Sequence, residues 1–116
     1  MPQTDMPILR DGRLHLVGHP SVEVDTDAWF VWLRQANRFC YWPTTSTFRL
    51  TVRKEKRRNA YYWYAYLKNA RKLHNAYVGR TEAVTNERLQ LVLDNLVHKV
   101  VLHRQGLGNS GSLPYF

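Results

Sequence analysis

Basic side chains are concentrated in one segment of this 116-residue chain. Ten Lys and Arg residues and a single acid, Glu55, lie between Arg49 and Arg80, whereas the rest of the chain carries seven basic and eight acidic residues. The same region holds the aromatic residues Phe48, Tyr61, Tyr62, Trp63, Tyr64, Tyr66 and Tyr77. Lys and Arg release counterions from phosphates, and rings and guanidinium planes stack on bases. We therefore expect a nucleic acid as the partner.

Eleven residues of this region form the predicted nucleic-acid site. They are Arg49, Thr51, Arg53, Tyr62, Tyr64 and Lys68 on strands, and Lys56, Arg57, Arg58, Arg71 and Lys72 in connections. Strand arginines can reach base edges in a major groove, whereas connection residues meet phosphates, which carry no base identity. A solvated charge run that merely protects a sheet edge is the simpler reading of 54–58. The coincidence of these charges with those at Arg49, Arg53 and Arg71 favours a phosphate-contacting surface.

The residue types argue against catalysis. A metal-dependent nuclease needs clustered carboxylates, and Glu55 is the only acid of the basic segment. His98 and His103 miss the i, i+4 spacing of helical metal ligands, and no CxxC or HExxH pattern occurs. Cys40 lies among aromatic residues and is expected to be buried and inert. We expect no enzymatic activity, no catalytic residue, no metal and no cofactor.

Two segments with helical periodicity must help to position the site. Apolar residues at i, i+3, i+4 and i+7 from Trp29 to Ala36 predict a helix with Thr26 as its N-cap. A second stripe from Leu89 to Val100 predicts a C-terminal helix after the N-cap Thr85.

Between these helices the period changes to two. Alternation predicts strands over 47–53, 60–68 and 72–78, joined by a polar hairpin connection at 54–59 and a turn at 69–71, with shorter strands at 13–17 and 39–42. On the central strand, Trp63, Ala65 and Leu67 are predicted core, and Tyr62, Tyr64, Tyr66 and Lys68 are predicted to face outward. The fold class expected is α+β, a three- to four-stranded antiparallel sheet covered by the C-terminal helix, plus an N-terminal helix.

Composition predicts one domain at 8–104, a flexible arm at 1–7 and a Gly/Ser-rich tail at 105–116. The single cysteine excludes an internal disulfide, and no apolar run approaches the length of a membrane span. The N-terminal sequence has no signal-peptide pattern. A cytoplasmic location is expected, nucleoid-associated if the protein binds DNA.

The region from Val24 to Leu96 resembles a short module of bacterial LuxR/MalT-like regulators. The resemblance rests on YWYAY at 62–66, RKLH at 71–74, AYVGRTE at 76–82 and TNERL at 85–89, preceded by AWFVWL at 28–33. Three strands followed by a helix are also similar in topology to AP2-type and integrase arm-binding domains. Those domains lay their sheet in a DNA major groove, which implies that the sheet would be the DNA-binding surface here.

The expected function is that of a small DNA-binding protein, a transcriptional regulator or accessory factor, that places a basic, aromatic-rich sheet on double-stranded DNA. RNA or single-stranded nucleic acid is the alternative, because exposed aromatics on a sheet also stack on bases. From another class, the chain could be a protein-interaction module with an acidic partner, and a homodimer is compatible with either reading.

Overall fold

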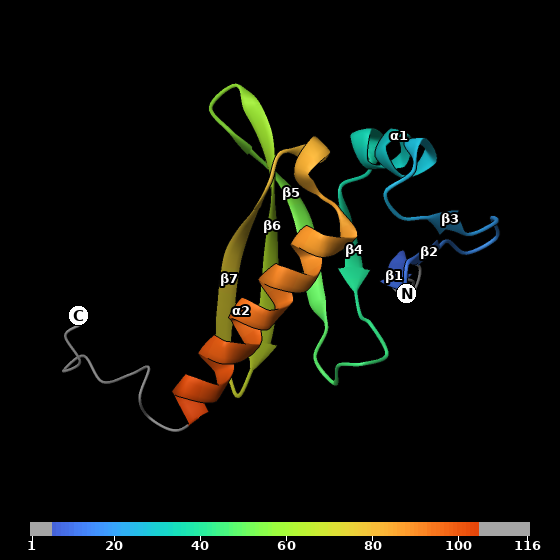
Figure 1. The fold of residues 1–116 in the computed structure, drawn as a ribbon. Coiled ribbons are helices and arrows are strands. Elements are labelled where there is room, and N and C mark those ends of the chain that lie inside the picture. Colours follow the sequence, from blue (N-terminus) through green and yellow to red (C-terminus); the bar gives the residue numbers. More distant parts are fainter. Residues whose placement is uncertain (1–5, 105–116) are drawn as a thin grey trace.

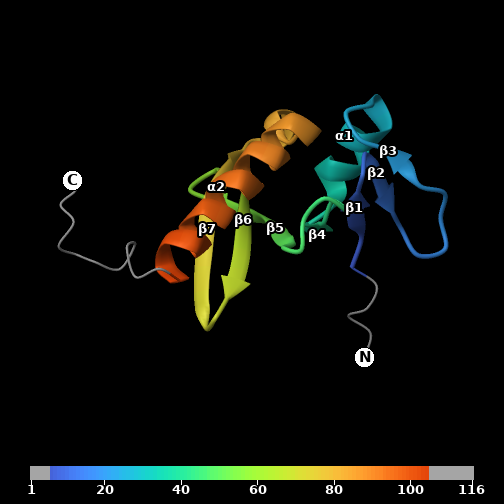
Figure 2. The same ribbon diagram turned by 60° about the horizontal axis from the view of Figure 1, so that its bottom comes forward.

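A seven-stranded mixed sheet forms one layer of the protein, and two helices pack against one of its faces (Figures 1 and 2). The computed structural model describes residues 6–104. The strands are β1 (Ile8–Arg10), β2 (Arg13–His15), β3 (Val22–Glu23), β4 (Arg38–Tyr41), β5 (Leu50–Arg57), β6 (Ala60–Asn69) and β7 (Lys72–Gly79). The helices are α1 (Asp27–Gln35) and α2 (Asn86–Arg104), with the 3-10 turn η2 (Thr81–Ala83) before α2. The α+β class is confirmed.

The sheet is larger than expected and not purely antiparallel. Its strand order is β3-β2-β1-β4-β5-β6-β7, and β1 runs parallel to β4 while all other neighbours are antiparallel. The expectation of three to four antiparallel strands was therefore wrong. The added strands β1 and β3 have only three and two residues, which is too short for an alternation to be recognised.

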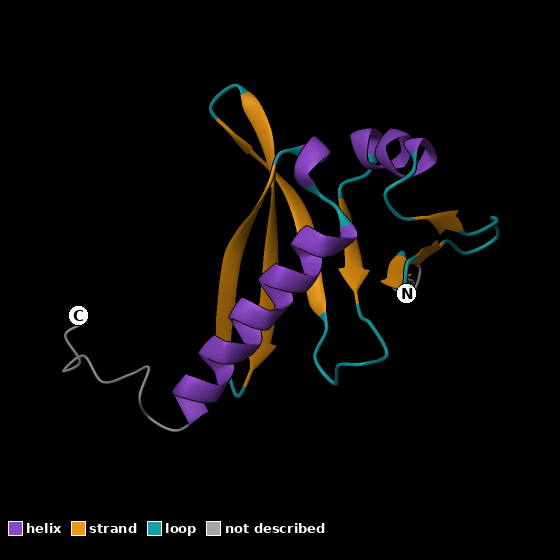
Figure 3. Cartoon of the chain, viewed as in Figure 1, coloured by secondary structure: helices purple, strands orange, loops and turns teal. Residues whose placement is uncertain are grey.

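The polar run at 54–59 was predicted to be a hairpin connection. In the structure it is mostly strand. β5 continues to Arg57, which pairs with Ala60, so the turn consists of Arg58 and Asn59 alone (Figure 3). The strand persists because β6 is rich in β-favouring aromatic residues and offers a complete backbone ladder. The end of the hairpin projects beyond the helices (Figure 1). Neither of its faces is buried in the core there, so charged side chains can occupy both.

Helix α1 begins where its cap was predicted, but it is not an N-terminal element. The Thr26 hydroxyl accepts a hydrogen bond from the Trp29 amide at 3.3 Å. Three short strands precede the helix, which is thus inserted between β3 and β4. At its other end the Lys54 ammonium donates to the carbonyls of Leu33 and Arg34, both at 3.0 Å. Lys54 therefore caps a helix rather than belonging to a solvated loop.

The start of the described chain is tied to the middle of the sheet. The Pro7 carbonyl accepts a hydrogen bond from the Cys40 amide at 2.8 Å, which fixes the last residue of the predicted arm. Residues 1–5 of that arm, and the predicted tail at 105–116, lie outside the described residues. None of the helices between residues 6 and 104 is long and apolar enough to cross a bilayer.

One apolar core joins both helices to the sheet. Helix α2 buries Leu89, Val92, Leu93, Leu96 and Val100, the stripe predicted from the sequence. Beneath it lie Trp63, Ala65 and Leu67 of β6, each at most 1% exposed. Trp29 of α1 joins the same core, and its indole N–H donates to the Val84 carbonyl at 2.8 Å. The two helices therefore cover the same face of the sheet.

Leu93→Ala should lower the free energy of unfolding by about 2–5 kcal/mol, because Leu93 is buried at the centre of the interface between α2 and the sheet. Urea denaturation checks this, with Leu91→Ala as the control, since Leu91 lies on the same helix and is 51% exposed. Equal changes in the two variants would contradict the packing.

His74 is a buried polar residue beneath α2. It is 7% exposed, and its Nε2 has no hydrogen-bond partner among residues 6–104. Burial lowers the pKa of His74, and the neighbouring His103, Lys72 and Lys99 lower it further. The folded protein therefore holds His74 in its neutral form.

This arrangement predicts acid sensitivity. The unfolded chain binds the His74 proton more readily, so stability is fully present above the unfolded pKa of about 6.5 and falls as pH drops from there towards the lower folded pKa. The free energy of unfolding, measured from pH 7.5 to pH 5, should fall less in His74→Leu than in the wild type. His15→Gln, at an exposed histidine of β2, is the control and should follow the wild-type profile.

Candidate nucleic-acid interface

The sheet face opposite the helices carries most of the predicted site residues. Because side chains alternate along a strand, burial of Leu50, Val52 and Trp63 on the helix side turns their neighbours to this second face. We call it the open face, since no helix within the described part of the chain covers it. Its side chains on β4 to β7 are Arg38, Cys40, Thr51, Arg53, Glu55, Arg57, Tyr62, Tyr64, Tyr66, Lys68, Leu73, Asn75 and Tyr77.

The sequence prediction for β6 is confirmed. Trp63, Ala65 and Leu67 are buried, whereas Tyr62, Tyr64 and Tyr66 are half-buried and Lys68 is exposed on the other face. Strand register places Arg53 opposite Tyr64, and Tyr64 opposite Tyr77. Arginines and tyrosines thus lie side by side on the open face.

Glu55 holds a network of side chains together on this face. One carboxylate oxygen, Oε1, lies 2.6 Å from Nη2 of Arg57, and the other accepts a hydrogen bond from the Tyr66 hydroxyl. The Arg57 guanidinium lies 4.8 Å from the ring centre of Tyr64, and that of Arg53 lies 5.3 Å from the ring centre of Tyr66. Each arginine rests on a ring, which restricts the positions that its guanidinium can take.

The Tyr66 hydroxyl is held in its protonated form. Burial raises the pKa of Tyr66, and its hydrogen bond to Glu55 and the negative charge of Glu55 raise it further, while Arg53 and Arg57 oppose the rise. Tyr66 is therefore a stable hydrogen-bond donor to Glu55 throughout the neutral range.

Charge on the open face is largely uncompensated. Across residues 6–104 the Arg57–Glu55 contact is the only ion pair. Arg38, Arg53 and Lys68 are exposed, and none of them forms an ion pair with a described residue. A surface of this kind attracts counterions that a polyanion can displace.

The predicted phosphate contacts divide between two ends of the sheet. Arg58 lies in the β5–β6 turn, and Arg71 lies in the β6–β7 turn at the opposite end of β6 (Figure 1). Because β6 has ten residues, these turns are separated by roughly 30 Å. Both arginines have positive φ, 59° and 69°, in a region that normally favours glycine or asparagine. Each turn therefore presents a cation from an unusual backbone position.

Two predicted residues are not on the open face. Lys56 alternates with Arg57, lies on the helix side of the hairpin and sits 5.9 Å from the ring centre of Tyr61. Lys72 lies on the helix side of β7, next to His74. Both are exposed, but the structure does not bring them together with Arg53 and Arg57.

Sequence reasoning missed a second cationic and aromatic group. The guanidinium carbons of Arg10 and Arg49 lie 4.7 and 5.2 Å from the ring centre of Trp42. Arg49 was predicted as a site residue, but Arg10 joins it only through the pairing of β1 with β4. Arg38 was also missed, and it lies opposite Arg53. Its alternation with the buried Phe39 was the signal that could have found it.

The structure also places Cys40 and the possible metal ligands of the sequence. Cys40 is buried beside this group, and burial raises the pKa of its thiol. No group of three or more His, Cys, Asp or Glu residues that could hold a metal ion occurs within residues 6–104.

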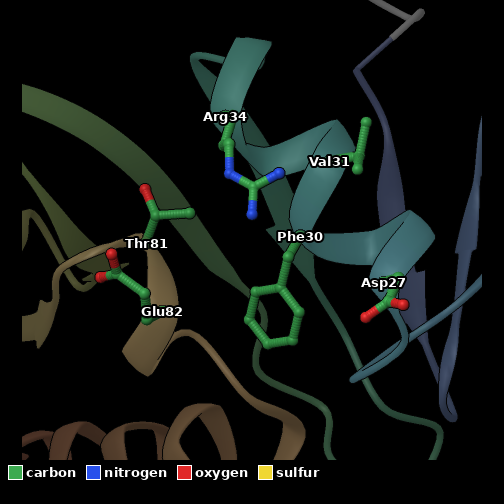
Figure 4. A pocket seen from close by; sticks show the side chains of 6 residues that line it. All are labelled: Asp27, Phe30, Val31, Arg34, Thr81 and Glu82. Carbon is green, nitrogen blue, oxygen red and sulfur yellow. The ribbon is translucent and has the colours of Figure 1, made fainter.

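A cleft of about 690 Å³ lies between α1 and η2 (Figure 4). The Phe30 ring points into it, and it is flanked by two carboxylates, Asp27 and Glu82, with one guanidinium, Arg34. Because α1 packs on the helix side of the sheet, this cleft is separate from the open face. Its mixed charge does not suit a phosphate.

Comparison of the chain with protein-family models, with curated proteins and with solved structures gave no match. The resemblances to the LuxR/MalT-like module and to AP2-type and integrase arm-binding domains therefore stay predictions.

Proposed function

We propose that this protein binds double-stranded DNA through the open face of its sheet. The observation that carries the proposal is the gathering of arginines and tyrosines on one sheet face, opposite a face that both helices cover. The tyrosine rings contact arginines there, and within residues 6–104 Arg57 alone among these arginines forms an ion pair. A single exposed charge run would need no such arrangement.

The dimensions of β5, β6 and β7 suit a major groove. Neighbouring strands lie about 4.8 Å apart, so three backbones span about 10 Å, close to the groove width of about 12 Å. Arg53 lies midway along β5 and can present its guanidinium edge to a base, where bidentate pairing with guanine is the commonest specific contact. Strands in the major groove are an established mode of recognition.

The state of the tyrosine rings favours a duplex over single strands. Tyr62, Tyr64 and Tyr66 have an arginine 4.8 to 5.4 Å from the ring centre. The Tyr64 and Tyr77 rings meet edge to face at 5.5 Å. Rings already engaged in this way offer less free surface for stacking on splayed bases. They support the arginines, which then contact groove edges and phosphates.

The turns at the two ends of β6 would contact the phosphate backbone. Their separation of roughly 30 Å is close to one helical turn of B-DNA, about 34 Å. Arg58 at one end, with Lys68 and Arg71 at the other, would fix the protein on the duplex without reading its sequence.

A competition assay tests the proposal. The protein is freed of co-purifying nucleic acid and bound to a labelled DNA duplex, which is then competed by unlabelled duplex DNA, single-stranded DNA or double-stranded RNA of equal length. Duplex DNA should compete best. Better competition by single-stranded DNA would indicate that the protein binds single strands by stacking on their bases. If no probe binds, a protein partner with an acidic surface would be favoured.

A matched pair of variants locates the surface. Arg53→Gln on the open face and Arg34→Gln on α1 each remove one exposed positive charge. Arg53→Gln should weaken binding by about 1–3 kcal/mol, and Arg34→Gln should leave it nearly unchanged. Equal losses would mean that only net charge matters.

A further inference from the structure

A hollow at the β5–β6 end of the open face is lined by three arginines. Its volume is about 550 Å³, and its lining residues are Arg57, Arg58, Asn59, Ala60, Tyr62 and Arg80. No carboxylate side chain lines this hollow, whereas two line the cleft beside α1. No local pattern of residues joins Arg80 to the hairpin, because 21 residues separate it from Arg58.

Donors reach the hollow from two separate segments of the chain. Arg57 and Arg58 come from the hairpin, and Arg80 comes from the segment that follows β7. Gly79 makes that segment turn, with φ 141°, and a Cβ there would lie only 2.8 Å from the Cβ of Ala83. The Arg80 guanidinium lies 5.4 Å from the ring centre of Tyr62. Ring and backbone therefore both orient Arg80 next to the hairpin.

The charge of the hollow suits a doubly charged group. Glu55 compensates part of the charge of Arg57. Arg58 and Arg80 form no ion pair with a described residue, although the carboxylate of Glu82 is near enough to act on Arg80 electrostatically. A phosphate monoester carries about −1.5 to −2 charges at neutral pH and has three free oxygens. An internal phosphodiester carries one charge and must have chain entering and leaving. Guanidinium forks that approach from two sides match the three oxygens of a monoester.

We propose that this hollow binds the terminal phosphate monoester of a nucleic-acid strand. The inference rests on the proposed function, because the hollow is continuous with the open face through Arg57 and Tyr62. It goes further than duplex binding, because it places the terminus of a nucleic-acid strand at the β5–β6 end of the sheet.

The test compares probes that differ only at their ends. Duplexes of one sequence, labelled internally, carry a 5′-phosphate, a 3′-phosphate or hydroxyls at both ends, and their dissociation constants are measured with the full chain. One phosphorylated probe should bind about 10- to 100-fold more tightly than the hydroxyl probe, as expected for charge-assisted hydrogen bonds. The end that is preferred identifies which terminus enters the hollow.

Variants test whether a preference for the phosphorylated probe arises in the hollow. Arg80→Gln should bring the affinity ratio of phosphorylated to hydroxyl probe close to one, and Arg58→Gln provides an independent second reading. Lys68→Gln, at the far end of β6, should weaken both probes and preserve the ratio. Equal affinities in the wild type, or a ratio that survives both arginine substitutions, would overturn the inference but leave duplex binding intact. Failure of all probes to bind would overturn both proposals.

Discussion

Trp63→Ala should lower the free energy of unfolding by about 3–5 kcal/mol. Trp63 is fully buried, lies 5.6 Å from Phe39 between ring centres, and donates its indole N–H to the Thr81 hydroxyl at 3.1 Å. The substitution therefore leaves a large cavity and removes a hydrogen bond in the region that joins β4, β6 and η2. Chemical denaturation followed by circular dichroism measures the change.

The adjacent residue provides a matched control on the opposite face. Tyr64→Ala removes a half-buried ring that supports Arg57 and contacts Tyr77. We expect it to weaken nucleic-acid binding by about 0.5–2 kcal/mol, because Arg57 loses the ring that positions it, with a much smaller loss of stability than Trp63→Ala. If Tyr64→Ala were the more destabilising of the two, the assignment of the two sheet faces would be wrong.

The affinity for duplex DNA should fall steeply and linearly with salt on a double logarithmic plot. About five phosphate contacts give a slope of about −4 to −5, which is a loss of roughly 250- to 1000-fold between 50 and 200 mM salt. The physical cause is the release of condensed counterions when Lys and Arg displace them. Fluorescence anisotropy at several salt concentrations measures the slope, and binding that ignores salt would contradict the charge argument.

Single substitutions should show how much each end of the sheet contributes to the salt dependence of binding. Arg58→Gln and Arg71→Gln remove cations from opposite turns, and each should reduce the slope by about 0.9. Lys56→Gln should have a smaller effect, because Lys56 lies on the helix side of the hairpin. If Lys56→Gln reduced the slope by about 0.9 and Arg58→Gln left it unchanged, the DNA would lie on the helix side of the hairpin.

Local signals were enough to predict the long elements. Helix α2 begins after a threonine whose hydroxyl accepts from the Arg88 amide at 3.2 Å, and its apolar stripe is buried as its spacing indicated. A missed local signal was Asp11-Gly12, which forms the β1–β2 turn with φ values of 51° and 87°. An Asp-Gly pair is a strong hairpin signal. Arg10 and Arg13 flank it here, with Leu9 and Leu14 one residue further out on each side, so this hairpin could have been predicted.

The non-local pairings had no local signal. The parallel contact between β1 and β4 joins residues about 32 positions apart, such as Leu9 and Tyr41, and depends on which short strands bury each other best. The continuation of β5 through Lys54 and Arg57 depends on the β6 ladder, which overrides the polar composition of that run.

For the candidate site, the sequence alone determined which side chains share a strand face, because the two-residue period of a strand is a property of the local backbone. It therefore separated Trp63 from Tyr64 correctly. Tertiary structure decided which face both helices cover, and which distant residues meet on the other one. Arg38 beside Arg53, Arg10 beside Trp42, and Arg80 beside the hairpin all result from strand order and chain reversal. Burial of a common core selects those arrangements, and no local pattern of residues encodes them.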